Sequence, residues 1–325
     1  MSLCNALNEV CTLHVWAISI RHGMPALHKE VKHAFEQTDI EIKPENPLTT
    51  LPSEANIFIY MAEYSIVFGQ DAEQWKLVFE RANSVQFSIN FNVGALPQFS
   101  WLGNYLSAIY FQNNEIVGLW QRKVLDTAMA TTPVVVLPPP VELDAFKLIA
   151  PLHHNNKQLV IGLVSGVVKF APNVVSFYNT LAKRLPDAQF WFMPTPDFIH
   201  ENFKQHPQFF MFERNEMTVT AFLEAIDIYC FPSNVNASLQ GTRSLVEVMA
   251  AGRPAICVNR QGPKDRIIHG ESGYVTNMLD EMEDYVVQLA ENFECRERMG
   301  KAARERASKW LISDWRDSIL AYTKH

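Results

Sequence analysis

A guanidinium and a carboxylate, Arg243 and Glu247, stand four residues apart at the start of a predicted helix in the segment GTRSLVEVMAAGRPAICV, residues 241–258. Backbone amides at a helix start lack partners within the helix and attract anions. Arg243 would add a cation that matches two phosphate oxygens, and Glu247 would accept hydrogen bonds from two neighbouring sugar hydroxyls. The pair suits a ligand in which a diphosphate adjoins a ribose. Ser244 and Glu247 also fit a capping box, with Glu247 on a backbone amide, and spacing leaves both interpretations open.

The composition excludes several classes of protein. A chain of 325 residues, 48% of them hydrophobic, can bury more than one core, so we expect two domains. A net charge of -7 argues against a nucleic-acid partner. No apolar run approaches a membrane span, and the N-terminus lacks the order of a signal peptide. The five cysteines have no paired spacing and indicate reduced residues of a cytoplasmic protein, without a disulfide or zinc site.

Strand-like apolar runs alternate with helix-spaced segments along the chain. In the first half, strands are predicted over residues 13–20, 55–61, 84–91, 107–112 and 133–141, and helices over 25–37, 72–82 and 114–126. A second alternating series begins after residue 158. Such alternation requires crossover connections and predicts mostly parallel sheets.

The proline-rich segment over residues 138–158 is the best domain boundary, because consecutive prolines fit neither a helix nor a central strand. We expect domains over residues 1–140 and 141–310, and a C-terminal helix over 311–325 that crosses back to the first domain. Ligands of such sheets bind outside the carboxyl ends of the strands, here in a cleft between the two domains.

Residues 227–275 resemble the donor-binding half of the retaining, nucleotide-sugar-dependent glycosyltransferases of family four, which have the GT-B fold. The resemblance rests on Asp227, the Pro232-Ser233 loop, EVMAAGRP at 247–254 and HGESGYV at 269–275. It extends over residues 133–310, and before that only the order of strands and helices fits. It implies an α/β fold of two Rossmann-like domains whose parallel sheets face each other across a cleft. The first domain would bind the acceptor and the second the nucleotide-sugar.

The resemblance also implies roles for particular residues. Glu247 occupies the second glutamate of the family's Glu-x7-Glu motif, which holds the ribose hydroxyls. The first glutamate, which contacts the transferred sugar, is replaced by Leu239, and Gln240 beside it is a neutral substitute. Whether this loss abolishes activity is left open.

The family has an arginine and a lysine that neutralise the donor diphosphate, and this sequence matches only the lysine. Lys169 fits the lysine, but no arginine precedes it, and we expect Arg243 to supply the missing charge from the opposite wall. The resemblance therefore assigns catalysis to Lys169, Arg243 and Glu247, and donor binding to Gly23, Ser165, Gly166, Ser233, Gln240, Gly241, Thr242, Ser244 and Glu247.

Candidate acceptor contacts come from the first half of the chain. Gly23 lies in a strand-to-helix turn where glycine permits close approach of a ligand, and His22 beside it would orient an acceptor hydroxyl. Phe99 and Trp101 would stack on an acceptor glycan, with core packing as the alternative. The histidines lack metal-ligand spacing, so no metal is expected. Arg260, Lys264 and Arg266 are interpreted as a solvated basic face, which would suit a membrane surface.

The predicted function is transfer of a sugar from a nucleoside diphosphate sugar to a hydroxyl of a glycan or lipid-linked glycan, with retention and without a metal. Such chemistry serves cell-surface polysaccharide or glycoconjugate synthesis. The donor is a substrate and no other cofactor is expected, while peripheral membrane contact is a further expectation. The alternative is a catalytically silent relative that binds nucleotide-sugar or glycan and supports a partner transferase. A nicotinamide enzyme is disfavoured, because no G-x-G-x-x-G follows a predicted strand.

Overall fold

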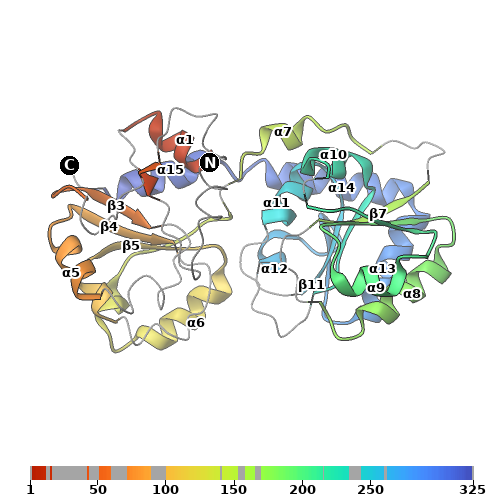
Figure 1. Ribbon diagram of the computed structural model, residues 1–325, viewed down its shortest axis with the longest axis horizontal. Helices are drawn as coiled ribbons and strands as arrows, with labels where there is room; N and C mark the ends of the chain where they lie inside the picture. The colour runs from red at the N-terminus through yellow and green to blue at the C-terminus, as the bar shows by residue number, and fades with distance from the viewer. Residues whose placement is uncertain are drawn as a thin grey trace. The chain divides into compact units, whose positions relative to one another are not determined.

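The computed structural model describes residues 2–11, 15–16, 42–43, 51–59, 72–88, 100–139, 141–152, 158–164, 170–214, 216–233, 243–259 and 262–323. The chain forms two compact units (Figure 1). Unit 1 comprises Met1–Val141 and Leu311–His325, and unit 2 comprises Glu142–Trp310. The helix predicted over residues 25–37 lies outside the described residues.

Unit 1 is built on a parallel four-stranded sheet in the order β3-β4-β5-β6. Its strands are β3 (Asn56–Ile59), β4 (Ser84–Ser88), β5 (Leu106–Phe111) and β6 (Val134–Val136). The crossovers include α5 (Ala72–Glu80), α6 (Asn114–Val124) and the short 3-10 helix η2 (Ala128–Thr131), and a separate parallel pair joins β1 (Val15–Trp16) to β2 (Ile42–Lys43). The side chain of Asn113 caps α6 by accepting from the Ile116 amide at 3.0 Å, which fixes where that helix begins.

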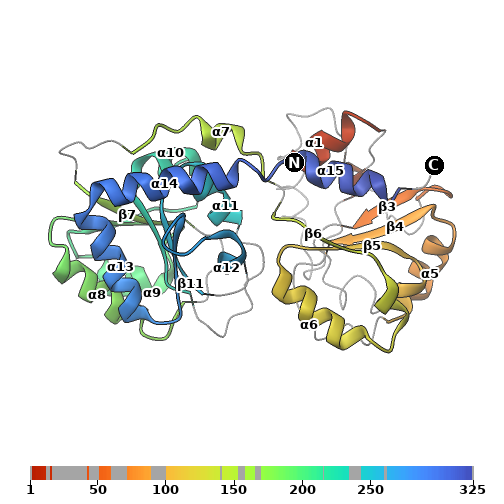
Figure 2. The same cartoon turned by 180° about the vertical axis from the view of Figure 1, so that it is seen from behind.

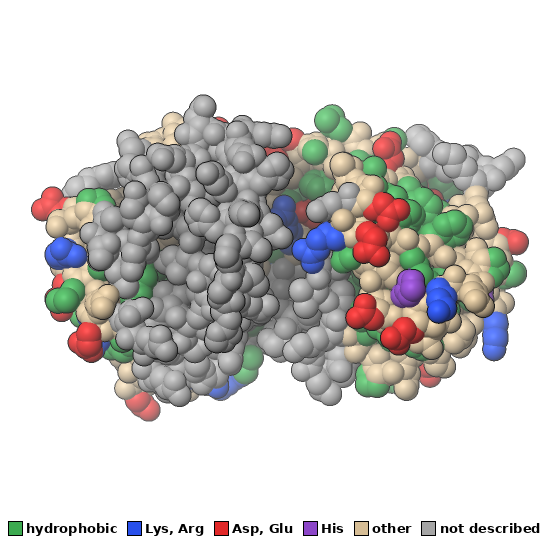
Figure 3. Space-filling model, viewed as in Figure 1, with side chains coloured by type: hydrophobic (Ala, Val, Ile, Leu, Met, Phe, Trp, Pro, Cys, Tyr) green, Lys and Arg blue, Asp and Glu red, His purple; other side chains and the backbone are tan. Residues whose placement is uncertain are grey.

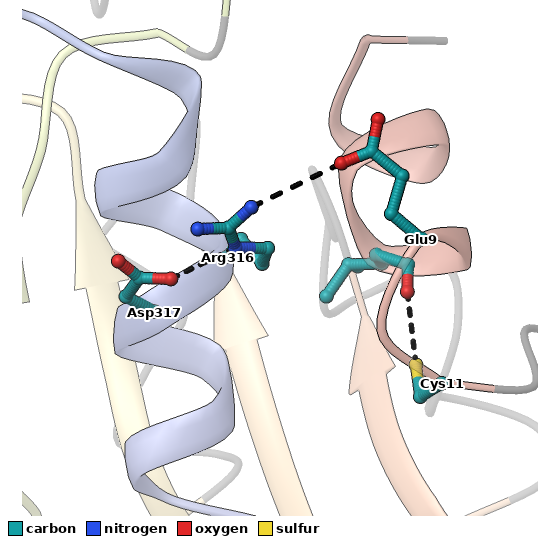
Figure 4. A network of polar contacts seen from close by, with 5 residues as sticks. Glu9, Cys11, Arg316 and Asp317 are labelled. Atoms are coloured by element: carbon teal, nitrogen blue, oxygen red, sulfur yellow. Dashed lines mark hydrogen bonds and ion pairs between the residues drawn. The ribbon is translucent and has the colours of Figure 1, made fainter.

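Both faces of this sheet are covered by helices (Figures 1 and 2). Helices α5 and α6 bury an aromatic core that includes Phe79, Phe87, Phe111 and Trp120. On the opposite face lie α1 (Ser2–Asn8) and α15 (Ile312–Ala321), with a core of Leu3, Leu7, Ala108, Tyr110, Trp315 and Ile319. An exposed ion pair between Arg316 and Glu9, 4.0 Å apart, joins the two helices at the surface (Figure 4).

Buried polar side chains of the sheet hold the end of α15. Gln86 Nε2 donates to the Ile319 carbonyl at 2.9 Å. Tyr110 Oη lies 2.8 Å from Gln86 Oε1 and 2.9 Å from the Ser318 carbonyl, either of which can accept its single proton. Carbonyls in the last turn of a helix have no intrahelical partner. The sheet therefore adds hydrogen bonds at the end of α15, where the Ile319 carbonyl also accepts from the Tyr322 amide at 3.2 Å and from Thr323 Oγ1 at 2.9 Å.

Unit 2 contains a six-stranded parallel sheet in the order β12-β11-β10-β7-β8-β9. Its strands are β7 (Val160–Val164), β8 (Gln189–Met193), β9 (Phe209–Met211), β10 (Ile228–Phe231), β11 (Ala255–Val258) and β12 (Gly273–Thr276). The chain winds from β7 outward to β9, then crosses back to β10 beside β7 and winds the other way. The direction thus reverses between β7 and β10, and in such sheets ligands bind at the carboxyl ends of the strands at this point.

Helices cover both faces of the second sheet as well. They are α7 (Asp144–Lys147), α8 (Val174–Arg184), α9 (Asp197–Phe203), α10 (Val219–Ala225), α11 (Arg243–Ala250), α12 (Pro263–Arg266), α13 (Leu279–Glu291) and α14 (Phe293–Ala307). Figures 1 and 2 show α8, α9 and α13 on one side of the sheet and α10, α11 and α14 on the other. Within the described parts of both units, no helix combines the length and the apolar character needed to cross a membrane.

Helix α14 lies unusually close to the end of α11. A Cβ built on Gly300 of α14 would stand 2.3 Å from the carbonyl oxygen of Gly252, which has a φ of +69° that favours glycine. The guanidinium of Arg304 adds hydrogen bonds from Nη2 to the carbonyls of Ile149 and Ala251, both at 2.7 Å. The C-terminal end of α11 is therefore held by a glycine contact and by an arginine clamp.

Candidate functional site

The start of α11 is joined to the end of β7 through a buried tyrosine of β10. Tyr229 Oη donates to the carbonyl of Val164, the last residue of β7, at 3.3 Å, and lies 3.4 Å from Ser244 Oγ. The tyrosine's one proton is used at Val164, so Ser244 is the donor in the second bond. Burial raises the pKa of Tyr229, which keeps the hydroxyl protonated. The switch point of the sheet and the first turn of α11 are thus held together.

Arg243 and Glu247 form an ion pair across one turn of α11. Arg243 Nε donates to Glu247 Oε1 at 2.9 Å. Glu247 is only 7% exposed, whereas the side chain of Arg243 is 70% exposed. Burial raises the pKa of Glu247, and the charge and hydrogen bond of Arg243 lower it in part. A carboxylate in a poorly solvated place is thereby paired with a guanidinium that reaches solvent.

The capping-box alternative does not hold. Helix α11 begins at Arg243, so Ser244 is its second residue and does not occupy the N-cap. The Ser244 hydroxyl meets Tyr229, and Glu247 accepts from the Arg243 side chain. Both residues are therefore available at the helix start for the role that the sequence first suggested.

Ser233 contributes a buried hydroxyl directly after β10. It is 1% exposed, its amide donates to the Phe231 carbonyl at 2.9 Å, and its backbone forms an antiparallel bridge with Phe170. Among the residues that the structure describes, its Oγ has no hydrogen-bond partner. Leaving a buried hydroxyl unpaired costs roughly 1–3 kcal/mol. The site thus holds a polar atom that a ligand or a water molecule would satisfy.

Of the candidate acceptor residues, Trp101 alone is described. It lies in unit 1, where its ring stacks with Phe79 at 6.4 Å and meets Tyr105 edge-on at 6.0 Å, with Lys76 Nζ 5.3 Å from its centroid. These are contacts of core packing, the alternative that the sequence left open. The following predicted residues lie outside the described residues: His22, Gly23, Phe99, Ser165, Gly166, Lys169, Leu239, Gln240, Gly241, Thr242 and Arg260 of the basic face.

The interpretation of Arg266 as part of a solvated basic face is wrong. Arg266 is 3% exposed, and its Nη1 donates to the Gly262 carbonyl at 3.0 Å. Burial lowers its pKa to about 10. On the face of unit 2 seen in Figure 3, acidic and basic side chains are interspersed. A membrane-facing basic patch that includes Arg266 is therefore not present.

Two residues that the sequence analysis did not assign carry structural roles here. The hydroxyl of Tyr229, in the apolar segment DIYCF, could have been identified only as a polar atom in a buried strand.

Arg253, 2% exposed, donates to the carbonyls of Leu223 at 2.8 Å, Ala150 at 3.1 Å and Glu224 at 3.2 Å. Burial lowers its pKa to about 10. Arg253 thus stabilises the fold, whereas the side chain of Arg243, paired with Glu247, is 70% exposed.

No group of three or more His, Cys, Asp or Glu side chains among the described residues could hold a metal ion.

The family model described as glycosyl transferases group 1 matches residues 143–306, which is half of the chain. The chain belongs to this family. A search of curated proteins finds no match. The matched residues contain β7 to β12 and therefore the whole described site.

Solved glycosyltransferase structures share the fold. A point mutant of Staphylococcus aureus TarM, in complex with fondaparinux, alpha-GlcNAc-glycerol and UDP, is 16% identical with a TM-score of 0.62, over 78% of this chain and 54% of that one. Anabaena Alr3699/HepE with UDP and glucose is 14% identical with a TM-score of 0.61, over 81% of this chain and 77% of that one. The pneumococcal O-GlcNAc transferase GtfA with UDP and GlcNAc is 15% identical with a TM-score of 0.60, over 77% of this chain and 55% of that one.

These likenesses confirm the predicted α/β GT-B fold with two sets of parallel strands. The chain spans about half the length of the TarM and GtfA chains. At such low identity the similarity concerns the fold, and the activity has to be argued from the site.

Proposed function

We propose that this chain is a glycosyltransferase that moves a sugar from a nucleoside diphosphate sugar to a hydroxyl of a glycan or lipid-linked glycan. The transfer would retain the anomeric configuration and would serve polysaccharide or glycoconjugate synthesis. The observation that carries the proposal is the buried Glu247 beside the exposed Arg243 at the start of α11. This pair stands at the switch point of the sheet in the domain that matches the family.

In the proposed reaction the bond between the anomeric carbon and the diphosphate breaks, and a bond to the acceptor oxygen forms on the same face of the sugar. The acceptor proton passes to the departing diphosphate. Negative charge develops on that diphosphate, and the amides that begin α11, Arg243 and Lys169 would stabilise it. Glu247 would hold the ribose by accepting hydrogen bonds from its hydroxyls. The chain then needs no protein nucleophile, no metal and no further cofactor.

A second candidate function is a silent relative that binds a nucleotide-sugar or glycan and supports a partner transferase in the cytoplasm or at a membrane surface. Leu239 favours it, because an apolar side chain stands where the family has the glutamate that contacts the transferred sugar. Both candidates need the same nucleotide site, and only the first predicts turnover.

Binding of ADP, GDP and UDP to the full chain, measured by calorimetry, tests the site, with UDP first because TarM, HepE and GtfA carry it in their complexes. Glu247→Gln should weaken binding at least about tenfold, since a hydrogen bond to a charged group contributes about 1.5–3 kcal/mol. Glu271→Gln, on an exposed glutamate of the same unit, is the matched control and should leave affinity unchanged. Release of sugar from the matching donor then separates the transferase from the silent relative. If no nucleoside diphosphate binds at millimolar concentration, both candidates fail.

A further inference from the structure

Two phenylalanines pair at the carboxyl edge of the unit 2 sheet. The rings of Phe170 and Phe198 are 4.6 Å apart between centroids and inclined by 70°. Phe198 is the second residue of α9, which follows β8. Phe170 is bridged to Ser233, the residue that ends the β10 segment. Both rings therefore belong to segments at the edge where ligands of such sheets bind.

This pair differs from the aromatic residues of the core. Phe190, Phe203 and Phe209 are buried and each contacts several rings, with Phe203 and Phe209 stacked at 4.1 Å. Phe170 and Phe198 are half-buried, and within the described part of the chain each meets no ring but the other. In an edge-to-face pair the faces of the edge-on ring are not covered by its partner. Among the described rings, the pair is therefore separate from the aromatic core.

The order of the strands places this pair beside the proposed nucleotide site. Strands β10, β7 and β8 are neighbours, so Ser233 and the two rings follow one another across the sheet edge. Neighbouring strands are about 4.8 Å apart, so β10 to β8 spans roughly 10 Å. A nucleoside has about this length. With its ribose at Glu247 near the start of α11, a nucleotide can extend its base over β7 and β8.

We infer that Phe170 and Phe198 bind the base of the nucleotide by stacking, with the buried hydroxyl of Ser233 as a hydrogen-bond partner for the same nucleoside. The inference rests on the proposed function, and it names the ligand part that this edge of the sheet recognises. A planar base has a π-face that stacks on an aromatic ring, whereas a sugar or a diphosphate alone has none. The unpartnered Ser233 Oγ, 1% exposed, is a second and independent sign of a ligand at this place.

The experiment compares nucleoside diphosphate with inorganic pyrophosphate on the full chain. The tightest binder among ADP, GDP and UDP is measured by calorimetry against wild type, Phe170→Leu and Phe198→Leu. Leucine keeps apolar volume and removes the ring. Stacking of one base contributes about 1–3 kcal/mol, so nucleotide affinity should fall about 5- to 150-fold while pyrophosphate affinity is unchanged. Phe198→Tyr, which keeps the ring, should retain wild-type affinity.

Phe203→Leu is the matched control, because Phe203 lies on the same helix, is 2% exposed and packs in the core. It should lower the melting temperature without changing the ratio of nucleotide to pyrophosphate affinity. Equal losses for both ligands in Phe198→Leu, or no loss for either, would overturn the inference and leave the proposed function standing. A loss seen only with the nucleotide-sugar would place the transferred sugar on the rings and also overturn it. Absence of nucleotide binding to wild type would remove the proposed function and the inference together.

Discussion

Replacing Gly300 by alanine tests whether the close approach of α14 holds the helix that carries Glu247. The added Cβ would stand 2.3 Å from the Gly252 carbonyl oxygen and 3.5 Å from Pro254 Cδ. Ordinary contact begins at 3.4 Å, so the shortfall at the oxygen is 3.4 - 2.3 = 1.1 Å. The oxygen belongs to the backbone and cannot rotate away as a side chain would. Relief therefore requires α11 and α14 to move apart.

The size of the effect follows from two opposing contributions. Overpacking of a tight contact costs about 1–3 kcal/mol, and a rigid backbone neighbour places this case at the upper end. Alanine in place of glycine inside a helix recovers about 1 kcal/mol. We expect Gly300→Ala to lower the free energy of unfolding of unit 2 by about 2 kcal/mol. Because Glu247 lies on the helix that is displaced, nucleotide affinity should fall as well.

Gly118→Ala is the matched control, since Gly118 is also inside a helix and its added Cβ would meet only Arg122 Nη1 at 3.7 Å. That variant should gain about 0.5–1 kcal/mol. Urea unfolding followed by circular dichroism measures both changes. If Gly300→Ala unfolds at the same urea concentration as wild type, or at a higher one, the glycine contact does not constrain the helix pair and the reasoning is refuted.

Three further predictions concern buried charges and the C-terminal helix. Burial raises the pKa of Glu247, so the stability that its protonated form contributes is complete below about pH 4.5 and is lost as pH rises through the raised pKa. The melting temperature of Glu247→Gln should therefore rise relative to that of wild type as pH increases, and a constant difference across pH would contradict this. Arg253→Met should cost about 3 kcal/mol in urea unfolding because it removes the donor of three backbone carbonyls, that of Leu223 being buried. Arg243→Met, the same change at an exposed site, should cost less because it removes one hydrogen bond, to Glu247, and it should weaken nucleotide binding; similar losses of stability would show that exposure does not separate the two. Tyr110→Phe should cost about 1–2 kcal/mol and make α15 more sensitive to proteolysis, and unchanged cleavage near Ser318 would argue against its role there.

The local sequence pattern was sufficient to predict the strands and the helix that position the site. The apolar run before residue 165 and the segment DIYCF became the neighbouring strands β7 and β10, because continuous apolar runs bounded by turn residues fit only buried strands in this alternation. The sequence also predicted a helix with Arg243 and Glu247 near its start, and α11 begins at Arg243. The reversal of strand order between β7 and β10 was not predicted, since periodicity does not say which strands are neighbours.

The sequence did not predict the environment of individual side chains. Arg266 was interpreted as solvated, yet the fold buries it against the Gly262 carbonyl, because a charged residue type does not show which carbonyls lie near it. The hydroxyl of Tyr229 acquires its role only when β7, β10 and α11 meet. Phe198 stands in PDFIHENF, whose apolar spacing is that of any amphipathic helix. Each of these depends on residues distant in the chain.

The contrast between Arg253 and Glu247 supports the functional role that we propose for Glu247. Arg253 donates from three nitrogens to three backbone carbonyls, so its buried charge is part of the fold. Glu247 is 7% exposed, and its ion-pair partner has a side chain that is 70% exposed, a poor arrangement for offsetting the cost of burying a carboxylate. An apolar side chain of similar volume would suit the fold at least as well, and ribose hydroxyls would supply what the carboxylate lacks. If Glu247→Met destabilised the chain as much as Arg253→Met, Glu247 would be structural and the nucleotide site would lose its main support.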